Sequence, residues 1–400
     1  MSFWPKVTLP EITAPNGVFI DGDWVESKDQ DPDGDVRLIQ LADIGDGEFL
    51  DKSARFLTSS KAKELRCTLL QPNDILLARM PDPLGRCCVF PGANQPCVTV
   101  VDVCIIRPDP RYVDTQWLMW HINSLSFRRQ INSFVNGTTR QRISRSNLAK
   151  IEFSLPPLDE QTRIAAIMDA AETLRVKRKK TIDRLEDLRL STFLAMFTGE
   201  EANKWPRVSV SDLVAQHKGA MRTGPFGSQL LHSEFIDEGI AVLGIDNVVQ
   251  NTFSWSQRRY ISEEKYRQLK RYTVFPGDVL ITIMGTCGRC AIVPEDVGTA
   301  INTKHLCCIT LDPEKCLPVY LQAAFLLNPE VRRQLSDAGR GAIMEGLNMG
   351  IISSLAVPLP PVHVQLSWQR FAAEHSHHLY QLNYAHVVTE RMITSCSASM

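Results

Sequence analysis

The chain has 400 residues, with 44 Lys and Arg against 45 Asp and Glu, and 44% of its residues are hydrophobic. At about 100–200 residues per domain, this length predicts two to four domains. The apolar fraction excludes an intrinsically disordered chain, and a content of only 22 glycines excludes a collagen-like one. The formal net charge of −1 argues against a uniformly basic nucleic-acid coat, although local basic patches stay possible.

The compartment is predicted from what the sequence lacks. The N-terminal segment Met1–Val7 has no basic region followed by an apolar stretch, and no run of about 18 or more apolar residues occurs. Eleven cysteines, an odd number, are spread along the chain, and several stand within apolar runs. Such cysteines are typical of small buried side chains in a reducing compartment. We therefore expect a cytoplasmic protein without a disulfide framework.

The chain contains one long internal repeat. With an offset of 204, Gln71–Leu77 aligns with Phe275–Ile281. With an offset of 201, Trp4-Pro5 aligns with Trp205-Pro206. A near-constant offset of about half the chain length indicates a duplicated unit, made of a globular domain followed by a helix.

The elements predicted in the first copy follow a fixed order. A strand rich in β-branched and aliphatic residues is predicted at Val36–Leu41, and a short helix begins after Thr58, a good N-cap. The turn Pro72-Asn73-Asp74 leads into an apolar strand, and a longer helix is predicted around Thr115–Phe134. The second copy repeats these features as the strand Ile240–Ile245, the cap Ser262, the turn Pro276–Asp278 and the helix Pro318–Leu335.

A long helix is predicted after each domain. Asp159–Phe197 contains no Gly or Pro, and its apolar residues recur mostly at steps of three and four. At 1.5 Å per residue this helix would be on the order of 55 Å long. Gly199 suits the left-handed position that ends a helix. The second helix covers about Val364–Met392, and we expect the two to pair antiparallel as one rod with a domain at each end.

The sequence therefore predicts an α+β fold with pseudo-two-fold symmetry. The expected boundaries are a first domain at 1–157, a central helix at 158–198, a second domain at 199–361 and a C-terminal helix and tail at 362–400. The residues expected to form the rod and to dock partner subunits are Gln161, Ile164, Ile167, Leu174, Leu185, Leu188, Phe193, Gln365, Phe371 and Leu382.

Several motifs, in their duplicated order, resemble the specificity subunits of type I restriction-modification systems. Leu155–Asp169, which opens the long helix, resembles the conserved helix of that family. Asp21–Trp24 and Gly224–Gln229 resemble the start of its target recognition domains. Leu280–Arg289 resembles its strand followed by a Gly-Thr-x-Gly-basic loop. The resemblance covers nearly all of the chain.

This resemblance implies a function in DNA recognition. Each domain would be a target recognition domain that reads one half of a split double-stranded DNA target, and the rod would fix the gap between the halves. The implied partners are two methyltransferase subunits and two motor-nuclease subunits. These partners would use S-adenosylmethionine, ATP and Mg²⁺, whereas this chain would bind no cofactor and carry no catalytic residue.

Candidate DNA contacts are basic and amide side chains. Arg and Gln can bond bidentately to base edges, and basic clusters suit phosphates. The first copy has Thr139–Arg142 where the second has Ile343–Gly346, which predicts two different half-sites and an asymmetric target. The candidates are Arg79, Arg86, Thr139, Arg140, Gln141, Arg142 and Arg145 in the first copy, and Gln229, Arg258, Arg259, Lys270, Arg271, Arg289, Asn302, Lys304, Met344 and Asn348 in the second.

Other interpretations stay open. The sequence has no phosphate-binding Gly-x-x-x-x-Gly-Lys loop and no motif typical of amino-methyltransferases, which favours a non-catalytic chain. Cys287 and Cys290 have metal-ligand spacing, but Leu84 replaces the first of them in the other copy, so buried cysteines are favoured. For His375–His378 we favour a polar coiled-coil face over a metal site, and for Lys177–Lys180 a docking face over a phosphate contact. A structural adaptor that binds only proteins is the alternative function.

Overall fold

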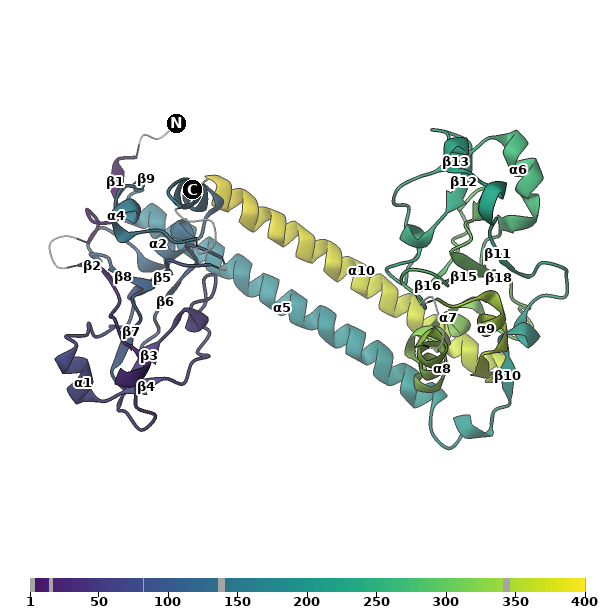
Figure 1. The fold of residues 1–400 in the computed structure, drawn as a ribbon, viewed down its shortest axis with the longest axis horizontal. Coiled ribbons are helices and arrows are strands. Elements are labelled where there is room, and N and C mark those ends of the chain that lie inside the picture. Colours follow the sequence, from purple (N-terminus) through teal and green to yellow (C-terminus); the bar gives the residue numbers. More distant parts are fainter. Residues whose placement is uncertain (1–3, 14–16, 82, 136–140, 341–345, 400) are drawn as a thin grey trace. The chain divides into compact units, whose positions relative to one another are not determined.

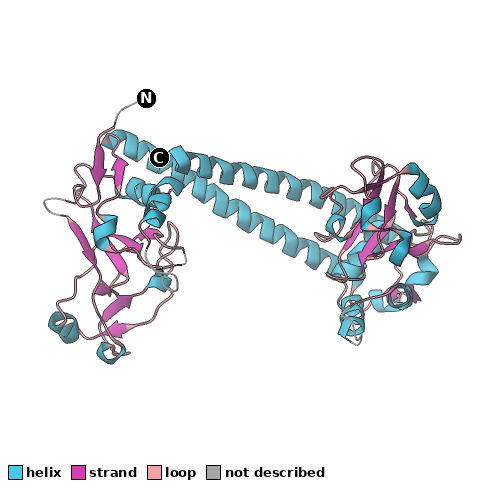
Figure 2. Cartoon of the chain, turned by 45° about the horizontal axis from the view of Figure 1, so that its top comes forward, coloured by secondary structure: helices cyan, strands magenta, loops and turns pink. Residues whose placement is uncertain are grey.

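The computed structural model describes residues 4–13, 17–81, 83–135, 141–340 and 346–399. The chain divides into two compact units, Met1–Lys180 with Asn383–Met400 (unit 1) and Thr181–Leu382 (unit 2) (Figure 1). Each unit mixes helices and sheets, which confirms the α+β class (Figure 2). The division falls within both long helices, whereas the boundaries predicted from sequence make each long helix a separate segment, 158–198 and 362–400. Among the described residues, no helix is both long and apolar enough to cross a lipid bilayer.

Unit 1 contains three small sheets. Their strand orders are β2-β8-β5-β6, β4-β3-β7 and β1-β9. The strands are β1 (Lys6–Thr8), β2 (Val18–Asp21), β3 (Val36–Ile39), β4 (Phe56–Leu57), β5 (Ile75–Ala78), β6 (Cys87–Val89), β7 (Cys97–Thr99), β8 (Val103–Arg107) and β9 (Glu152–Ser154). The helices are α1 (Ser59–Glu64), α2 (Thr115–Ile122), α3 (Leu125–Ser133), α4 (Arg145–Leu148) and the first part of α5 (Leu158–Phe197). Helix α2 packs against β6.

Unit 2 repeats this arrangement. Its sheets are β11-β18-β15-β16, β13-β12-β17-β14 and β10-β19. The strands are β10 (Arg207–Ser209), β11 (Met221–Thr223), β12 (Ile240–Leu243), β13 (Tyr260–Ile261), β14 (Thr273–Val274), β15 (Val279–Thr282), β16 (Cys290–Ile292), β17 (Ala300–Asn302), β18 (Leu306–Ile309) and β19 (Ala356–Pro358). The helices are α6 (Glu263–Leu269), α7 (Pro318–Leu327), α8 (Pro329–Arg340), α9 (Met349–Ser354) and α10 (Val362–Ser399).

The two units agree in strand pairing. In unit 1, β3 pairs in parallel with β7, with Arg37 opposite Cys97, and in unit 2, β12 pairs in parallel with β17, with Ala241 opposite Ala300. The matched elements keep their order along the chain, from β1 and β10 to α5 and α10. The internal repeat found in the sequence is therefore a repeat of fold.

The single helices predicted at Thr115–Phe134 and Pro318–Leu335 are wrong, because each is two helices in the structure. The Ser124 hydroxyl accepts a hydrogen bond from the amide of Phe127 at 3.2 Å and so caps α3 as a new helix. In unit 2, the Asn328 side chain accepts from the amide of Val331 at 3.2 Å, directly before Pro329 begins α8. Both side chains offer a local partner to amides that a continuous helix would have paired with its own carbonyls.

The long helices are confirmed, and within each unit a segment of α5 pairs with a segment of α10. In unit 1, Arg178 donates to the carbonyl of Ala385 at 2.7 Å. In unit 2, Nε2 of His375 lies 2.8 Å from the carbonyl of Leu185, and His375 is buried. His375 is therefore a polar residue within the helix pair and not a solvated one. Gly199, at φ +100°, ends α5 in the left-handed conformation as expected.

The cores confirm the expected role of the cysteines. Cys87 and Cys104 are fully buried in the main core of unit 1, and Cys290 and Cys307 are fully buried in that of unit 2. Burial raises the pKa of Cys307 to about 12, which makes it an inert apolar side chain at neutral pH.

Candidate nucleic-acid interface

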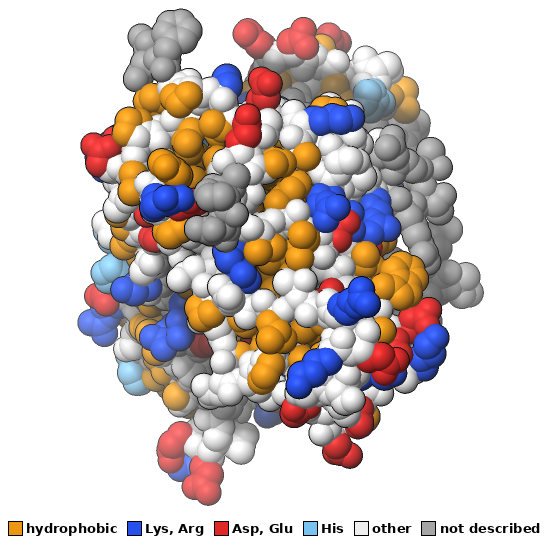
Figure 3. Space-filling model, turned by 90° about the vertical axis from the view of Figure 1, so that its left-hand side faces the viewer, with side chains coloured by type: hydrophobic (Ala, Val, Ile, Leu, Met, Phe, Trp, Pro, Cys, Tyr) orange, Lys and Arg blue, Asp and Glu red, His pale blue; other side chains and the backbone are white. Residues whose placement is uncertain are grey.

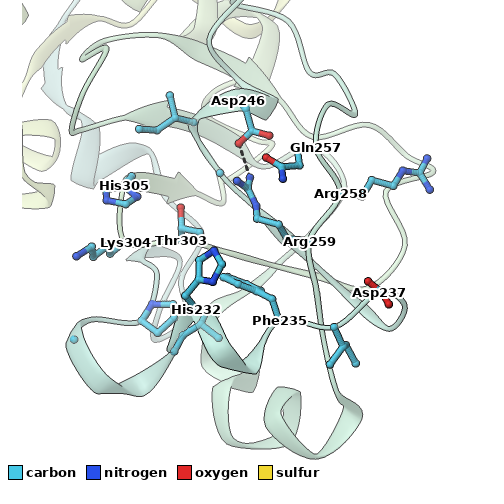
Figure 4. A pocket seen from close by; sticks show the side chains of 16 residues that line it. His232, Phe235, Asp237, Asp246, Gln257, Arg258, Arg259, Thr303, Lys304 and His305 are labelled. Atoms are coloured by element: carbon cyan, nitrogen blue, oxygen red, sulfur yellow. Dashed lines mark hydrogen bonds and ion pairs between the residues drawn. The ribbon is translucent and has the colours of Figure 1, made fainter.

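A hollow of about 570 Å³ lies in unit 2 (Figure 4). Three segments form it: the one after β11, the one after β12, and the one after β17, which contributes Thr303, Lys304 and His305. Arg258 and Arg259, which precede β13, complete its basic lining. Because all these residues follow or precede strand ends, the sheet fixes their positions while their side chains stay free to vary.

One ion pair organises this hollow. Nη2 of Arg259 pairs with Oδ1 of Asp246, and the hydroxyl of Ser256 donates to Oδ2 of the same carboxylate. Burial opposes ionisation of Asp246, but the hydrogen bonds from Ser256 and Arg259 and the arginine charge hold its pKa below the usual range. Arg259 is thus neutralised within the protein, whereas Arg258 points away from this pair in Figure 4 and is exposed.

The basic residues near the hollow are interleaved with aromatic rings. The guanidinium carbon of Arg258 lies 5.0 Å from the ring centroid of Trp255, and that of Arg271 lies 4.7 Å from the ring of Tyr272. A planar cation stacked on a ring is held in one orientation while its N–H groups stay available to acceptors such as phosphate or base edges.

Unit 1 has a hollow of about 760 Å³ at the corresponding place. Its lining includes Leu41 and Ala42 after β3, and Val100, Val101 and Asp102 after β7. These positions match the segments after β12 and β17 in unit 2. Here the charges differ, because Asp23, Glu26 and Asp102 accompany a single cation, Arg142, which pairs with Asp102 at 3.1 Å. The same place in the fold therefore presents two different chemical surfaces.

An exposed aromatic residue follows the first strand of two matched sheets, β2-β8-β5-β6 in unit 1 and β11-β18-β15-β16 in unit 2. Trp24 of unit 1 is 68% exposed, and Phe226 of unit 2 is 55% exposed. Both stand two residues after a glycine that follows the strand, Gly22 after β2 and Gly224 after β11. We did not select either ring from the sequence, although both lie in the motifs quoted for the resemblance. Aromatic residues at matched positions of the repeat were the available sequence signal.

Three of the predicted DNA contacts are buried: Arg79, Arg86 and Asn302 are 3%, 8% and 0% exposed. Arg86 donates to the carbonyl of Ile44 at 2.7 Å and to that of Leu41 at 2.9 Å. Arg79 pairs with Asp21 at 3.3 Å. The amide of Asn302 donates to the carbonyl of Leu306 at 2.9 Å. The prediction that these three residues contact DNA is therefore not supported by the structure. Their polar groups are buried and bonded to the protein, and they stabilise the walls of the hollows.

The other described candidates are at least partly accessible. Arg142, Arg259 and Lys304 are half-buried at the hollows, and Gln141, Arg145, Gln229, Arg258, Lys270, Arg271, Arg289 and Asn348 are exposed. Several of the exposed ones have structural partners: Asn348 caps α9 through the amide of Ile351, and the hydroxyl of Tyr272 donates to Gln229 and accepts from Arg271. Arg289 lines a separate hollow with Arg189 and Arg332. Thr139, Arg140 and Met344 lie outside the described residues.

The residues predicted to form the helical rod fall into three groups. Gln161 and Gln365 are fully buried and join each helix to its domain. Phe193 is fully buried, and Ile164, Leu185, Phe371 and Leu382 are partly buried. Ile167, Leu174 and Leu188 are 48%, 49% and 47% exposed, because the helix pair covers a stripe narrower than the apolar stripe of α5.

The two-cysteine motif is split by burial. Cys290 lies within β16 and is fully buried, which raises the pKa of its thiol, whereas Cys287 is exposed and its sulfur lies 3.3 Å from the carbonyl oxygen of Ile283. Within the described ranges, no cluster of three His, Cys, Asp or Glu side chains is arranged to hold a metal ion.

Charge is scattered on one face of the molecule. On the face shown in Figure 3, Lys and Arg side chains lie between apolar and acidic ones. This pattern agrees with the balanced composition and restricts any contact with a polyanion to local sites.

Comparison with known proteins shows what this chain is similar to. Residues 18–186 match the type I restriction modification DNA specificity domain. The chain is 24% identical over 267 residues to the EcoBI specificity subunit of Escherichia coli and 21% identical over 253 residues to the MjaVIII specificity subunit of Methanocaldococcus jannaschii. The chain is therefore similar to type I specificity subunits, through the family model in its first part and through these two relatives over 59% of its length.

The coverage of these family members is partial. Each match takes in 59% of this chain, and the chain spans only 53% and 57% of the length of the two relatives. A third member, the putative MjaX specificity subunit of M. jannaschii, is 18% identical over 82% of this chain and 77% of its own length.

Solved structures of the family share the fold. The S subunit of a type I restriction-modification system from M. genitalium aligns over 99% of this chain and 95% of its own, with a TM-score of 0.61 and 14% identity. A chain from a study of type I system assembly aligns over 99% and 96%, with a TM-score of 0.59 and 15% identity.

Proposed function

We propose that this chain is the DNA sequence-recognition subunit of a type I restriction-modification complex, with each unit reading one half of a bipartite, asymmetric target. The observation that carries the proposal is the pair of matched hollows with different linings. A repeated scaffold brings the same loops to a duplex twice, and different side chains on these loops select different bases.

The accessible cations near each hollow supply the contacts. In unit 2, Arg258, Lys304 and the exposed pair Lys270 and Arg271 are suited to phosphates, which fix register without reading sequence. In unit 1, Arg142 is the cation at the hollow, and Gln141 and Arg145 are exposed beside it. Trp24 and Phe226 would add apolar contacts to base or sugar. The buried Arg79, Arg86 and Asn302 hold the backbone that presents these groups.

The reaction chemistry would belong to partners. We assign two methyltransferase subunits, which use S-adenosylmethionine, and two motor-nuclease subunits, which use ATP and Mg²⁺, while this chain acts without a catalytic residue in the cytoplasm. The exposed apolar side chains of α5, Ile167, Leu174 and Leu188, support docking of partner helices, because apolar groups in contact with water gain free energy when a partner covers them.

Mapping methylated adenines in the host genome tests this proposal. We expect a split motif with a fixed gap in cells that express the chain with its methyltransferase partner, and loss of that motif when its gene is deleted. Restoring the gene should restore the motif. Methylation without sequence preference, or an unchanged motif in the deletion strain, would overturn the proposal.

A further inference from the structure

Unit 2 has another hollow, of about 630 Å³, which we call the arginine hollow. Three arginines from separate segments line it: Arg189 of α5, Arg289 of the loop between β15 and β16, and Arg332 of α8. Apolar side chains of α7 form part of the wall, and none of the described lining residues is acidic. An apolar wall strengthens the electrostatic interactions of the charges beside it, and the volume is within the range of ligand pockets.

These arginines are not neutralised within the chain. In the part that the structure describes, none of the three guanidinium groups makes an ion pair or a hydrogen bond. Arg289 and Arg332 are exposed, and Arg189 is half-buried. Burial lowers the pKa of Arg189 below its usual range, although the charge of Glu186 acts in the opposite direction. A guanidinium that has lost part of its hydration without gaining an ion pair is stabilised when an anion binds to it.

The arginine of unit 1 that matches Arg289 is bonded within the protein. The amide of Ala78 donates to the carbonyl of Arg86 at 2.8 Å, and the amide of Thr282 donates to the carbonyl of Arg289, also at 2.8 Å. This shared backbone bond identifies the two arginines as equivalent. The side chain of Arg86 is buried and donates to backbone carbonyls, whereas that of Arg289 is exposed.

The arginine of unit 1 that matches Arg332 is paired with a carboxylate. Arg128 and Arg332 each stand four residues after the side chain that caps their helix, α3 or α8. Arg128 forms an ion pair with Asp46. At the repeat offset of 204, Gln250 stands in the place of Asp46. Unit 2 therefore keeps the cation and has lost its counter-charge.

The structure supports this offset at the loop that carries the change. Gly47 and Asn251, the residues that follow Asp46 and Gln250, both have left-handed backbones, with φ of 85° and 61°. The amide of Gly47 donates to the carbonyl at the start of β6 at 2.9 Å, and Oδ1 of Asn251 accepts from the amide at the start of β16 at 3.2 Å. The lost carboxylate is thus a change of side chain at one position of a shared loop.

We propose that the arginine hollow is a binding site for a phosphate group. Three cations suit a multiply charged anion better than a single carboxylate, and the planar guanidinium matches phosphate oxygens through paired hydrogen bonds. Asn251 also lines the hollow, and its Nδ2 has no partner among the described residues, so it adds a neutral donor. A small phosphorylated molecule and the DNA backbone both carry this group, and the test separates these two sources. The inference does not depend on sequence reading by the two matched hollows.

Thiol protection tests the site on the full-length protein. Cys287 is exposed and lines the arginine hollow, whereas Cys396, the other exposed cysteine in the described ranges, belongs to unit 1. The probes are inorganic pyrophosphate and a short DNA duplex, and the alkylating reagent is neutral iodoacetamide, which the arginines do not attract. We expect a bound phosphate to slow alkylation of Cys287 severalfold, as measured by mass spectrometry, and to leave Cys396 unchanged. The bound anion covers the thiol and opposes its ionisation.

Matched substitutions connect the protection to the arginines. Arg289→Gln and Arg332→Gln should each raise the probe concentration that gives half-maximal protection about tenfold, because each removes a charged hydrogen-bond donor. Arg333→Gln is the control, since Arg333 is exposed beside Arg332 on the same helix and does not line the hollow. This variant should be protected as wild type is. Sodium chloride at the same ionic strength should protect neither cysteine.

Each outcome of the experiment decides a point. Protection by pyrophosphate assigns a small phosphorylated ligand, and protection by the duplex alone assigns a phosphate of the DNA backbone. Absence of protection by both probes, equal protection by sodium chloride, or equal effects of Arg332→Gln and Arg333→Gln would overturn the inference. If a variant unfolds, the comparison of the probes with sodium chloride on wild type still decides. Mapping of methylated adenines does not test this site, so its failure and the failure of the proposed function are distinguishable.

Discussion

His121 is a titratable residue enclosed by aromatic rings in the core of unit 1. Its ring centroid lies 5.1 Å from that of Trp117, 5.6 Å from Phe127 and 4.9 Å from Phe153. Burial, with a smaller contribution from the charge of Lys6, lowers the pKa of His121 from 6.5 to about 4. The folded state therefore holds this imidazole neutral where the unfolded chain would protonate it.

This shift predicts a loss of stability in acid. Between pH 6.5 and 4 the unfolded state binds more protons at His121 than the folded state does, so the free energy of unfolding falls as pH falls. The total loss from this group is about 3 kcal/mol. Denaturant unfolding of wild type and His121→Phe at several pH values checks this prediction. Carboxylates that titrate in the same range affect both proteins, so the difference between the two proteins reports on His121. Parallel curves for the two proteins would contradict the assignment.

Asp278 ends the Pro-x-Asp turn of unit 2 and is 1% exposed. Its carboxylate accepts from Nη2 of Arg222 at 2.5 Å, from the hydroxyl of Thr310 at 2.6 Å and from the amide of Phe275 at 2.8 Å. Asp74 has the equivalent place in unit 1, but its arginine, Arg107, comes from a different strand. The aspartate is thus repeated while its partner is not.

We expect Asp278→Ala to lower the free energy of unfolding by about 3 kcal/mol, because it leaves Arg222 buried without its counter-charge. The measurement is denaturant unfolding at neutral pH. As a control, Asp296→Ala removes an exposed carboxylate of the same unit and should change stability by less than about 0.5 kcal/mol. Equal effects of the two substitutions would show that the buried pair does not stabilise the fold.

At the scale of elements, each long helix begins at a buried glutamine. Gln365 on α10 accepts from the amide of Leu317 and donates to the carbonyls of Lys315 and Pro360, at 2.8, 3.0 and 2.9 Å. A single side chain thus satisfies three backbone groups from two segments and joins the helix to its domain. The sequence predicts both glutamines in a docking surface, because identity at repeated positions does not distinguish a hydrogen bond within the chain from a contact with a partner.

Gln365→Ala should therefore lower the free energy of unfolding by about 2 kcal/mol, since it leaves buried backbone groups without partners. Gln381→Ala on the same helix removes an exposed glutamine and should have little effect. Thermal and denaturant unfolding of both variants are the measurements. A neutral Gln365→Ala would mean that water replaces the side chain.

At the scale of the whole molecule, the proposed function predicts that the two units recognise their halves of the DNA target independently. Arg142→Ala in unit 1 should relax one half of the methylated motif, and Arg258→Ala in unit 2 should affect binding only through the other half. If the arginine contacts a base edge, each substitution should weaken the free energy of DNA binding by about 1–3 kcal/mol. If it contacts a phosphate, the substitution should weaken binding to all sequences and reduce the salt dependence of binding.

Sequencing of methylated sites from cells that express each variant complex distinguishes these outcomes. Arg111→Ala is a suitable control, because Arg111 pairs with Asp109 through bonds of 2.5–3.1 Å and lines neither of the two hollows. A variant that altered both halves equally would contradict independent readers.

The sequence by itself determined the repeat, the class of fold, the long helices and the family resemblance. These follow from patterns that are local or recur at a fixed offset, such as the Pro-x-Asp turns, the apolar steps of α5 and the glycine that ends it. The sequence prediction failed where a local side-chain hydrogen bond decided the structure, because Ser124 and Asn328 each begin a new helix inside an apolar run. The apolar periodicity continues across each of these breaks, so periodicity does not reveal them.

Only the tertiary structure decided which polar residues are accessible. Arg86 and Arg258 are equally basic in sequence, but the first bonds to buried carbonyls and the second is stacked, exposed, on Trp255. It also brought together loops from β3 and β7, and from β12 and β17, into matched hollows. Burial and the meeting of distant loops depend on residues far apart in the chain, and sequence spacing does not encode them.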